Sequence, residues 1–204
     1  MAGTALPDKG WDGFSDEELI EKAKQKDKNA FTALYKKHNG RILSYLYRYI
    51  GDYQKAEDLM IDTFLNAYIN LDKYRERGLF LSWLYKIATN CAKKELRKNL
   101  NVIEISMEKT SERDDEQSLS DKIGDERSRP DYNARQAELK EFVEKALSRL
   151  KSKYKDVLLL CDVEGLSYEE AAKTLNVTIK VVSMRLMRSR RMLFGILRKH
   201  GYVV

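Results

Sequence analysis

Apolar residues recur three or four positions apart through most of the chain, which is the spacing of amphipathic helices. The longest runs with this period cover residues 28–50, 54–71, 80–98, 134–150 and 154–161. Only two prolines and ten glycines interrupt the 204 residues, which argues against a turn-rich all-β fold. The pattern therefore predicts an all-α protein.

Capping residues mark where several of these helices begin and end. Two pairs, Ser15 with Glu18 and Ser167 with Glu170, have the spacing of a capping box. In that arrangement the hydroxyl and the carboxylate satisfy the first free amides of a helix. The other expected caps and stops are Asp27, Gly51, Asp52, Asn176 and Thr178.

The composition changes between residues 99 and 131. From Glu104 to Arg129 there are nine acidic and five basic residues, a net charge of −4, and few large apolar side chains. Such a segment cannot bury enough apolar surface to fold alone, so it predicts a flexible acidic linker. The chain then divides into a flexible arm (1–14), a helical domain (15–98), the linker (99–131) and a second helical domain (132–204).

Residues 165–191 predict a helix-turn-helix. The capped helix after Ser167 is broken near Asn176, the helix after Thr178 is rich in arginine, and no acidic residue follows Glu170. The whole chain carries a net charge of +6, which favours a polyanion as partner. A basic second helix of this kind suits the major groove of DNA. The alternative is a basic amphipathic hairpin that only packs or touches a membrane surface.

Two further surfaces carry charge in the first domain. Asp58 and Asp62 lie one turn apart on a helix, where like charges repel unless a basic partner relieves them. An ordinary solvated acidic face fits the same residues, and on the residues alone it is favoured. In residues 80–98, aromatic side chains stand beside a basic helix face, a combination that suits stacking of unpaired bases over a phosphate-binding surface.

Several classes of function find no support in the sequence. His38 and His200 are isolated, and there is no glycine-rich phosphate loop or two-histidine metal helix. Cys91 and Cys161 lie outside any metal motif and suit two buried thiols in a reducing cytoplasm. No secretory signal and no apolar run of roughly 20 residues is present. We therefore expect no enzyme, cofactor, bound metal or membrane insertion, and a cytoplasmic protein.

The chain resembles bacterial sigma factors of the extracytoplasmic-function group, which contain only regions two and four. Three segments in the family's order carry the resemblance: AEDLMIDTFLNAY (56–68), FLSWLYKIATN (80–90) and CDVEGLSYEEAAKTLNVTIKVVSMRLMRSRR (161–191). The resemblance implies a region 2 bundle and a region 4 helix-turn-helix. It also implies a subunit that binds core RNA polymerase, recognises −35 and −10 promoter elements and captures the melted −10 strand.

The resemblance implies roles for residues of the first domain. Asp58, Ile61 and Asp62 correspond to the face that docks on the clamp helices of the polymerase β′ subunit, where the family usually has Gln in place of Ile61. The resemblance also implies that a base of the −10 element is flipped near the loop before residue 80. The residues implied for the −10 element are Tyr74, Asn90, Lys93, Lys94 and Arg97, of which the basic ones meet phosphates.

The helix from Thr178 corresponds to the reader of the −35 element. Met184 lacks the paired donors and acceptors of a bidentate base contact, so it favours apolar contacts such as thymine methyl groups. The groove-facing positions carry Ser183, Met184, Met187 and Arg188, while Lys180, Arg185 and Arg190 hold phosphates or pack.

The implied partners are promoter DNA, core polymerase through the β′ clamp helices and the β flap, and an anti-sigma factor. Two interpretations from other classes stand beside this one. A stand-alone helix-turn-helix regulator would bind DNA tightly as a dimer, with half-sites about one helical turn apart. The sequence offers no obvious dimer element for it. The third interpretation is a nucleic-acid-processing enzyme.

Overall fold

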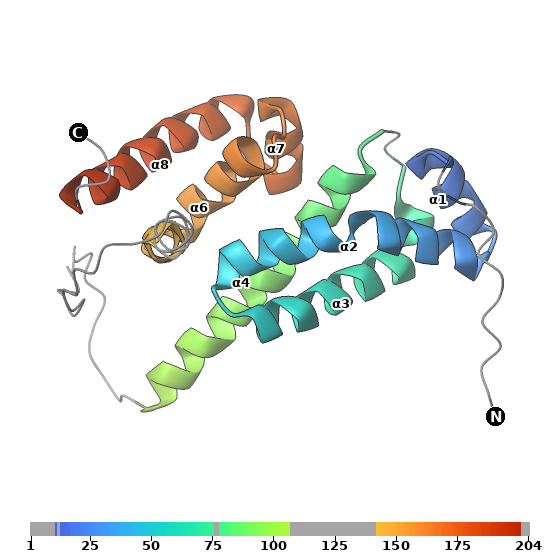
Figure 1. Ribbon diagram of the computed structural model, residues 1–204, viewed down its shortest axis with the longest axis horizontal. Coiled ribbons are helices and arrows are strands. Elements are labelled where there is room, and N and C mark those ends of the chain that lie inside the picture. The colour runs from blue at the N-terminus through green and yellow to red at the C-terminus, as the bar shows by residue number, and fades with distance from the viewer. Residues whose placement is uncertain (1–10, 12, 76–77, 107–141, 201–204) are drawn as a thin grey trace, which may run out of the picture.

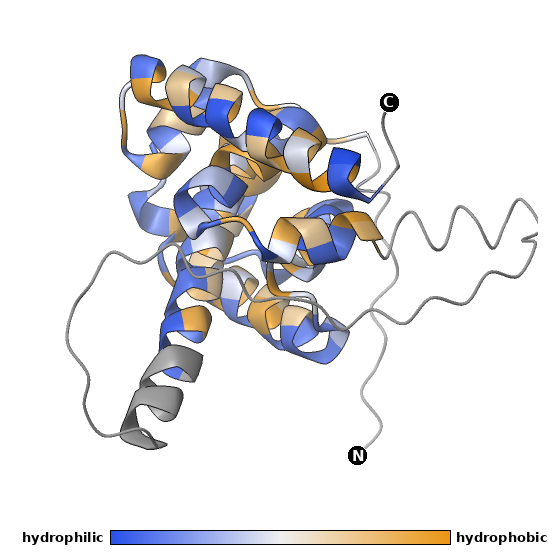
Figure 2. Cartoon of the chain, turned by 90° about the vertical axis from the view of Figure 1, so that its left-hand side faces the viewer, coloured by the Kyte–Doolittle hydropathy of each residue, from blue (hydrophilic) through white to orange (hydrophobic). Residues whose placement is uncertain are grey.

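The computed structural model describes residues 11, 13–75, 78–106 and 142–200, and every regular element in these ranges is helical. Most of the predicted arm 1–14, and the predicted linker from residue 107 onward, lie outside the described residues. The prediction of an all-α protein with two helical units is confirmed (Figure 1). Apolar and polar residues share each helix, as expected for amphipathic helices packed around cores (Figure 2).

The helices form two units that lie against each other (Figure 1). The first unit contains α1 (Asp16–Lys24), α2 (Lys28–Ile50), α3 (Tyr53–Ile69), a 3₁₀ turn η1 (Leu71–Lys73) and α4 (Phe80–Ser106). The second contains a helical segment at 142–148, α6 (Ser152–Leu158), a π-helical turn η2 (Leu159–Val163), α7 (Tyr168–Leu175) and α8 (Ile179–Lys199).

The predicted caps are confirmed. Ser15 with Glu18, and Ser167 with Glu170, each form both hydrogen bonds of a capping box. Because these bonds join residues three positions apart, the local sequence alone determines them. Asp27, Asp52 and Thr178 accept backbone amides at the starts of α2, α3 and α8, while Gly51 and Asn176 adopt left-handed conformations at the ends of α2 and α7.

The core of the first unit lies where α2 meets α3 and α4. Leu46 of α2 and Leu84 of α4 are both fully buried there. The Tyr45 hydroxyl is 2.7 Å from the Thr89 hydroxyl, and this buried hydrogen bond joins α2 to α4. Burial raises the pKa of Tyr45 above its usual value, so this hydroxyl stays protonated. Both apolar packing and a hydrogen bond therefore join α4 to α2.

α4 continues to Ser106, past the expected domain end at residue 98. The predicted linker therefore begins as helix, and the boundary predicted at residues 98 and 99 does not coincide with the end of the element. The boundary was predicted from the change in composition. No glycine or proline, the residues that commonly end a helix, occurs between residues 79 and 123.

The helix expected over residues 154–161 changes to a π-helical turn at Leu159. The Glu164 amide donates to the Leu159 carbonyl at 2.9 Å, a bond that spans five residues instead of four. The spacing of apolar residues cannot distinguish this turn from α-helix. The turn places Glu164 beside the first unit, where the Glu164 carboxylate accepts hydrogen bonds from Tyr85 and Arg48.

Buried polar contacts join the two units. The Asp156 carboxylate of α6 accepts a hydrogen bond from the Tyr49 hydroxyl at 2.7 Å, and Lys93 Nζ of α4 lies 2.6 Å from it. Asp156 is only 2% exposed. The neighbouring Lys155 ammonium donates to the Tyr49 carbonyl at 3.2 Å, and burial lowers the pKa of Lys155 to about 8. Ionisable groups thus lie inside the contact between the units.

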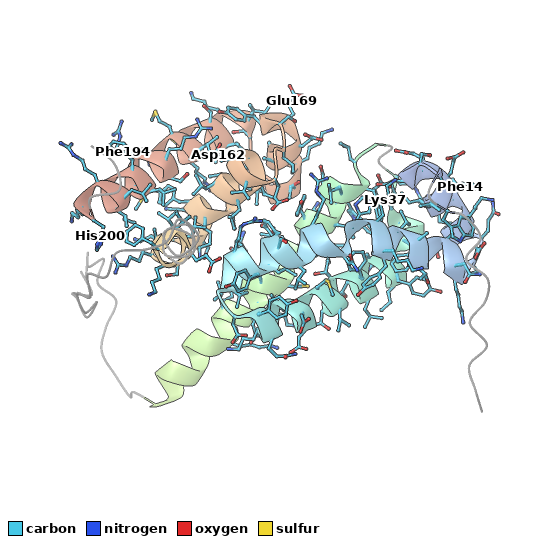
Figure 3. The ribbon with its side chains drawn as sticks, viewed as in Figure 1. Phe14, Lys37, Asp162, Glu169, Phe194 and His200 are labelled. Carbon is cyan, nitrogen blue, oxygen red and sulfur yellow. The ribbon has the colours of Figure 1, made fainter. Side chains whose placement is uncertain are left out.

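Asp16, at the start of α1, ties this helix to α2. Its carboxylate forms a 2.8 Å hydrogen bond with His38 Nε2, and Lys37 Nζ lies 2.8 Å from the other oxygen. Figure 3 shows Lys37 on the side of α2 that faces α1. Burial acts to raise the pKa of Asp16, but His38 and Lys37 outweigh it and lower the pKa to about 2.

Asp16→Asn is expected to lower the free energy of unfolding at pH 7 by about 2 kcal/mol. The lowered pKa means that the stabilisation is present above the ordinary pKa of 3.8 and is lost as the pH falls through about 2. Urea unfolding at pH 7 and pH 3 measures both effects. Asp27→Asn is the control, since asparagine caps α2 as well as aspartate does. Equal losses in the two variants would contradict the assignment.

Candidate functional surfaces

The exposed face of α3 combines carboxylates with large apolar side chains. Asp58 and Asp62 are both exposed, and within the described residues neither forms an ion pair. Ile61, Leu65 and Ile69 share this face and are 57%, 54% and 64% exposed. These five residues are called the α3 strip below. A contiguous apolar row of this kind is typical of a protein-binding surface.

The predicted −10 residues of α4 fall into two groups. Asn90, Lys94 and Arg97 are exposed, and their spacing of four and three residues places them on one face of the helix. Asn90 and Lys94 also line a groove of about 360 Å³ between α3 and α4, whose opposite wall includes Asp62. The basic face of α4 therefore borders the α3 strip.

Lys93 belongs to the second group. Its ammonium pairs with the buried carboxylate of Asp156, so the structure places it in the contact between the units. The structure does not bring Lys93 together with Lys94 and Arg97 on the free face. The predicted phosphate contact of Lys93 therefore requires its separation from Asp156.

Tyr74 lies below the surface and is 6% exposed. Its ring packs against Phe80 and Trp83, with centroids 5.7 and 5.2 Å away. Tyr74 forms part of the wall of a hollow of about 730 Å³, together with Ile20 and Arg75. In this conformation the ring is packed on Phe80 and Trp83, and little of its surface is available for stacking on a base.

The predicted −35 residues lie along the outer side of α8. Val182, Leu186 and Ser189 are buried on the inner side of the helix, against the rest of the second unit. Arg185 is half-buried beside them. Lys180, Ser183, Met184, Met187, Arg188 and Arg190 are all exposed.

Arg190 differs from the other exposed cations of α8. Its guanidinium donates two hydrogen bonds to the Asp162 carboxylate, at 2.8 and 2.5 Å, and these bonds link α8 to η2. The hydrogen bonds to Asp162 raise the pKa of Arg190 further above its usual range. Of the two roles expected for Arg190, phosphate contact or packing, this geometry supports packing.

Some exposed residues on these faces were not among the predicted ones. Lys86 lies one turn before Asn90 on α4, and Arg191 lies one turn after Met187 on α8. A search for cations at helical spacing from Asn90 could have found Lys86, whereas Arg191 was counted among the basic residues of its helix without a predicted role. Leu65 and Ile69 of the α3 strip were also missed, although their helical spacing from Asp62 places them on the same face.

Within the described ranges, no group of three or more histidine, cysteine or acidic side chains is arranged to hold a metal ion. None of the helices described is long and apolar enough to cross a membrane. Cys91 and Cys161 are free and half-buried, so they are less buried than expected. Burial raises the pKa of the Cys161 thiol to about 11.

The chain is similar to known proteins in both units. The family "Sigma-70 region 2" matches residues 34–101, and "Sigma-70, region 4" matches residues 143–193. The ECF RNA polymerase sigma-E factor of Haemophilus influenzae is 29% identical over 184 residues, which are 88% of this chain and 94% of that protein.

Two solved structures share the fold. CnrH, determined in complex with the cytosolic domain of CnrY, has a TM-score of 0.65 and 24% identity over 90% of this chain and 97% of its own. The sigma factor RpoE of Bartonella quintana, crystallised with the anti-sigma factor NepR, has a TM-score of 0.62 and 23% identity, covering 82% and 96% of the two chains.

The two family matches together cover more than half of the chain, and they fall on the two helical units in the predicted order. The resemblance found in the sequence is thereby confirmed. The chain belongs to the sigma-70 family of RNA polymerase sigma factors, in its extracytoplasmic-function group.

Proposed function

We propose that this chain binds core RNA polymerase and directs it to promoters that contain specific −35 and −10 elements. It acts in the cytoplasm as a dissociable subunit without catalytic activity of its own. The observation that carries the proposal is the pair of unlike exposed surfaces, the acidic and apolar α3 strip and the basic outer side of α8. The first suits a protein partner, and the second suits duplex DNA.

The proposal divides the work between the domains. Residues 15–98 bind the polymerase β′ clamp helices through the α3 strip and capture the melted −10 strand through α4. Opening one base pair costs a few kcal/mol, and stacking on aromatic side chains returns about 1–3 kcal/mol per base. Residues 132–204 read the −35 element and contact the β flap, and the linker 99–131 connects the two.

An anti-sigma factor is a further proposed partner. The support is the shared fold with the Bartonella quintana sigma factor, which was crystallised with such a partner. The exposed apolar residues of the α3 strip and of α8, such as Met187 and Phe194, offer surfaces that such a partner could cover.

Promoter binding with and without core polymerase tests the proposed function. We expect the chain alone to bind duplex DNA weakly and as a monomer, and core polymerase to increase its affinity for selected promoters by at least about 100-fold. A stand-alone regulator would instead bind tightly without polymerase, as a dimer on half-sites about one turn apart. Gel filtration and electrophoretic mobility of DNA pools separate the two outcomes.

Arg188→Ala is expected to reduce discrimination at one position of the −35 element by about 1–3 kcal/mol, because a bidentate contact to guanine is lost. Selection of promoters from a randomised pool by the polymerase complex measures this loss. Arg198→Ala removes the same charge near the end of α8 and should leave discrimination unchanged. Uniform weakening on all sequences would make Arg188 a phosphate contact instead.

A further inference from the structure

Two side chains of α1 reach the loop that leads into α4. The loop covers residues 74–79, of which the structure describes all but 76 and 77. Glu17 Oε1 accepts a hydrogen bond from the Gly78 amide at 2.8 Å. Lys24 Nζ donates to the Tyr74 carbonyl at 3.1 Å and lies 5.9 Å from the centroid of the Tyr74 ring. Side chains of one helix thus bind the loop near both of its ends.

The spacing of these two side chains suits them to hold the loop in a fixed place. Glu17 and Lys24 are seven residues apart, so they project from the same side of α1, about 10 Å from each other along its axis. Both hydrogen bonds involve a charged group, which makes such bonds roughly twice as strong as neutral ones. The Lys24 side chain is 22% exposed and also pairs with Glu21 at 3.3 Å, which orients its ammonium. Two points on one helix therefore set the position of the loop.

The loop borders an open space. The hollow of about 730 Å³ is lined by Glu17 and Lys24 of α1 and by Tyr74 and Arg75 of the loop. Gly78 is exposed, and its φ of 74° is a left-handed conformation that favours glycine. Exposed backbone beside an open space is held by its hydrogen bonds more than by packing. Loss of either bond to α1 should therefore let the loop shift.

A shift of this loop has a consequence for promoter selection, if a base of the −10 element is captured beside it, and that role of the loop rests on the proposed function. A flipped base is recognised by hydrogen bonds to its edge and by stacking in a close-fitting pocket. Such bonds weaken steeply with misalignment, and a binding site must be held to within about 0.5 Å. Movement of the loop should alter the choice of base more than the contacts with phosphates.

We propose that Glu17 and Lys24 are positioning residues for recognition of the −10 element. They fix the loop at Gly78 and at Tyr74, and the fixed loop determines which base is accepted beside it. Neither side chain has to touch DNA for this role. α1 thereby takes part in promoter selection through the loop.

Two pairs of variants in the full chain separate the hydrogen bonds from the charges. Glu17→Gln keeps an acceptor for the Gly78 amide without the charge, whereas Glu17→Ala removes both. Lys24→Arg keeps a charged donor, whereas Lys24→Met keeps only the aliphatic length. Glu21→Ala and Lys22→Met are the matched controls, because both residues line the same hollow from α1 and neither forms a hydrogen bond to the described part of the loop.

NMR of the free chain measures the fixing of the loop. We expect the Gly78 amide to exchange its hydrogen at least about threefold faster in Glu17→Ala than in the wild type, and Glu17→Gln to stay close to the wild type. The carbonyl carbon signal of Tyr74 should shift in Lys24→Met and less in Lys24→Arg. The controls should leave both signals unchanged.

Selection of promoters from a randomised pool by the polymerase complex measures recognition. Preference at one position of the −10 element should fall at least about threefold in Glu17→Ala and in Lys24→Met, with preference in the −35 element unchanged. Glu17→Gln, Lys24→Arg and the controls should keep the wild-type preference. A merely structural role would reduce selection of all sequences equally, because it lowers only the amount of folded chain.

Unchanged exchange of the Gly78 amide in Glu17→Ala, or an unchanged Tyr74 signal in Lys24→Met, would overturn the fixing of the loop by that residue. Movement of the loop with an unchanged −10 preference, or an equal loss in the controls, would overturn the positioning role. Failure of the proposed function has a different signature. The wild-type chain would then give core polymerase no promoter preference, while Glu17→Ala and Glu17→Gln would still differ in exchange.

Discussion

Reversal of both carboxylates of the α3 strip, in Asp58→Arg/Asp62→Arg, is expected to weaken binding to core RNA polymerase by about 2–4 kcal/mol, or roughly 30- to 1000-fold. Both side chains are exposed and unpaired within the described residues, so the reversal leaves the fold intact. The loss arises because a basic polymerase surface would then meet arginine. Competition between labelled wild-type chain and the variant for core polymerase measures the change.

Asp72→Arg is the matched control for this charge reversal. Asp72 lies in η1 of the same unit, is exposed, and forms an ion pair with the exposed Lys26 at 3.6 Å. Its reversal should change polymerase affinity by less than about threefold, since exposed ion pairs contribute little. If the double variant competes as well as the wild type, or if the control loses as much affinity, the α3 strip is not the polymerase-binding surface.

Leu84→Ala is expected to lower the free energy of unfolding by about 2–5 kcal/mol. Leu84 is fully buried where α4 meets the core of the first unit, so truncation leaves a cavity beneath α4. Urea unfolding followed by circular dichroism measures the loss. A change below about 1 kcal/mol would mean that the core does not hold α4 in the manner described.

Leu65→Ala makes the same truncation on the exposed α3 strip. Leu65 is 54% exposed, so its truncation should change stability by no more than about 0.5 kcal/mol. We expect instead a loss of more than about 1 kcal/mol in polymerase affinity, because a central apolar contact of the interface is removed. Unchanged affinity would show that the apolar part of the strip is not used.

Sequence reasoning predicted the helices and their caps because these features depend on residues three or four positions apart. Ser15, Asp27 and Thr178 cap the helices that they were expected to cap. Burial along α8 follows the helical period, so its exposed side could be read from the sequence as well. The π-helical turn at Leu159 could not be predicted from the sequence, because it shifts the spacing of apolar residues by only one position.

The contact between the units was beyond sequence reasoning for a different reason. Tyr49 and Asp156 are 107 positions apart, and nothing local marks either residue as a partner of the other. Tyr74 was matched to a loop aromatic, but its ring packs on Phe80 and Trp83, and helical periodicity does not extend across the loop that separates Tyr74 from these residues. The sequence did not distinguish Arg190 from the other cations of α8, and the structure does so by showing its hydrogen bonds to Asp162.

The central claim is that this chain gives core RNA polymerase a promoter preference. Mapping of transcript 5′ ends on a genomic DNA library, with purified core polymerase and with or without the chain, tests it most directly. We expect new start sites that appear only with the chain and share one upstream and one −10 sequence, and their loss with Asp58→Arg/Asp62→Arg. The same start sites with and without the chain would contradict the account.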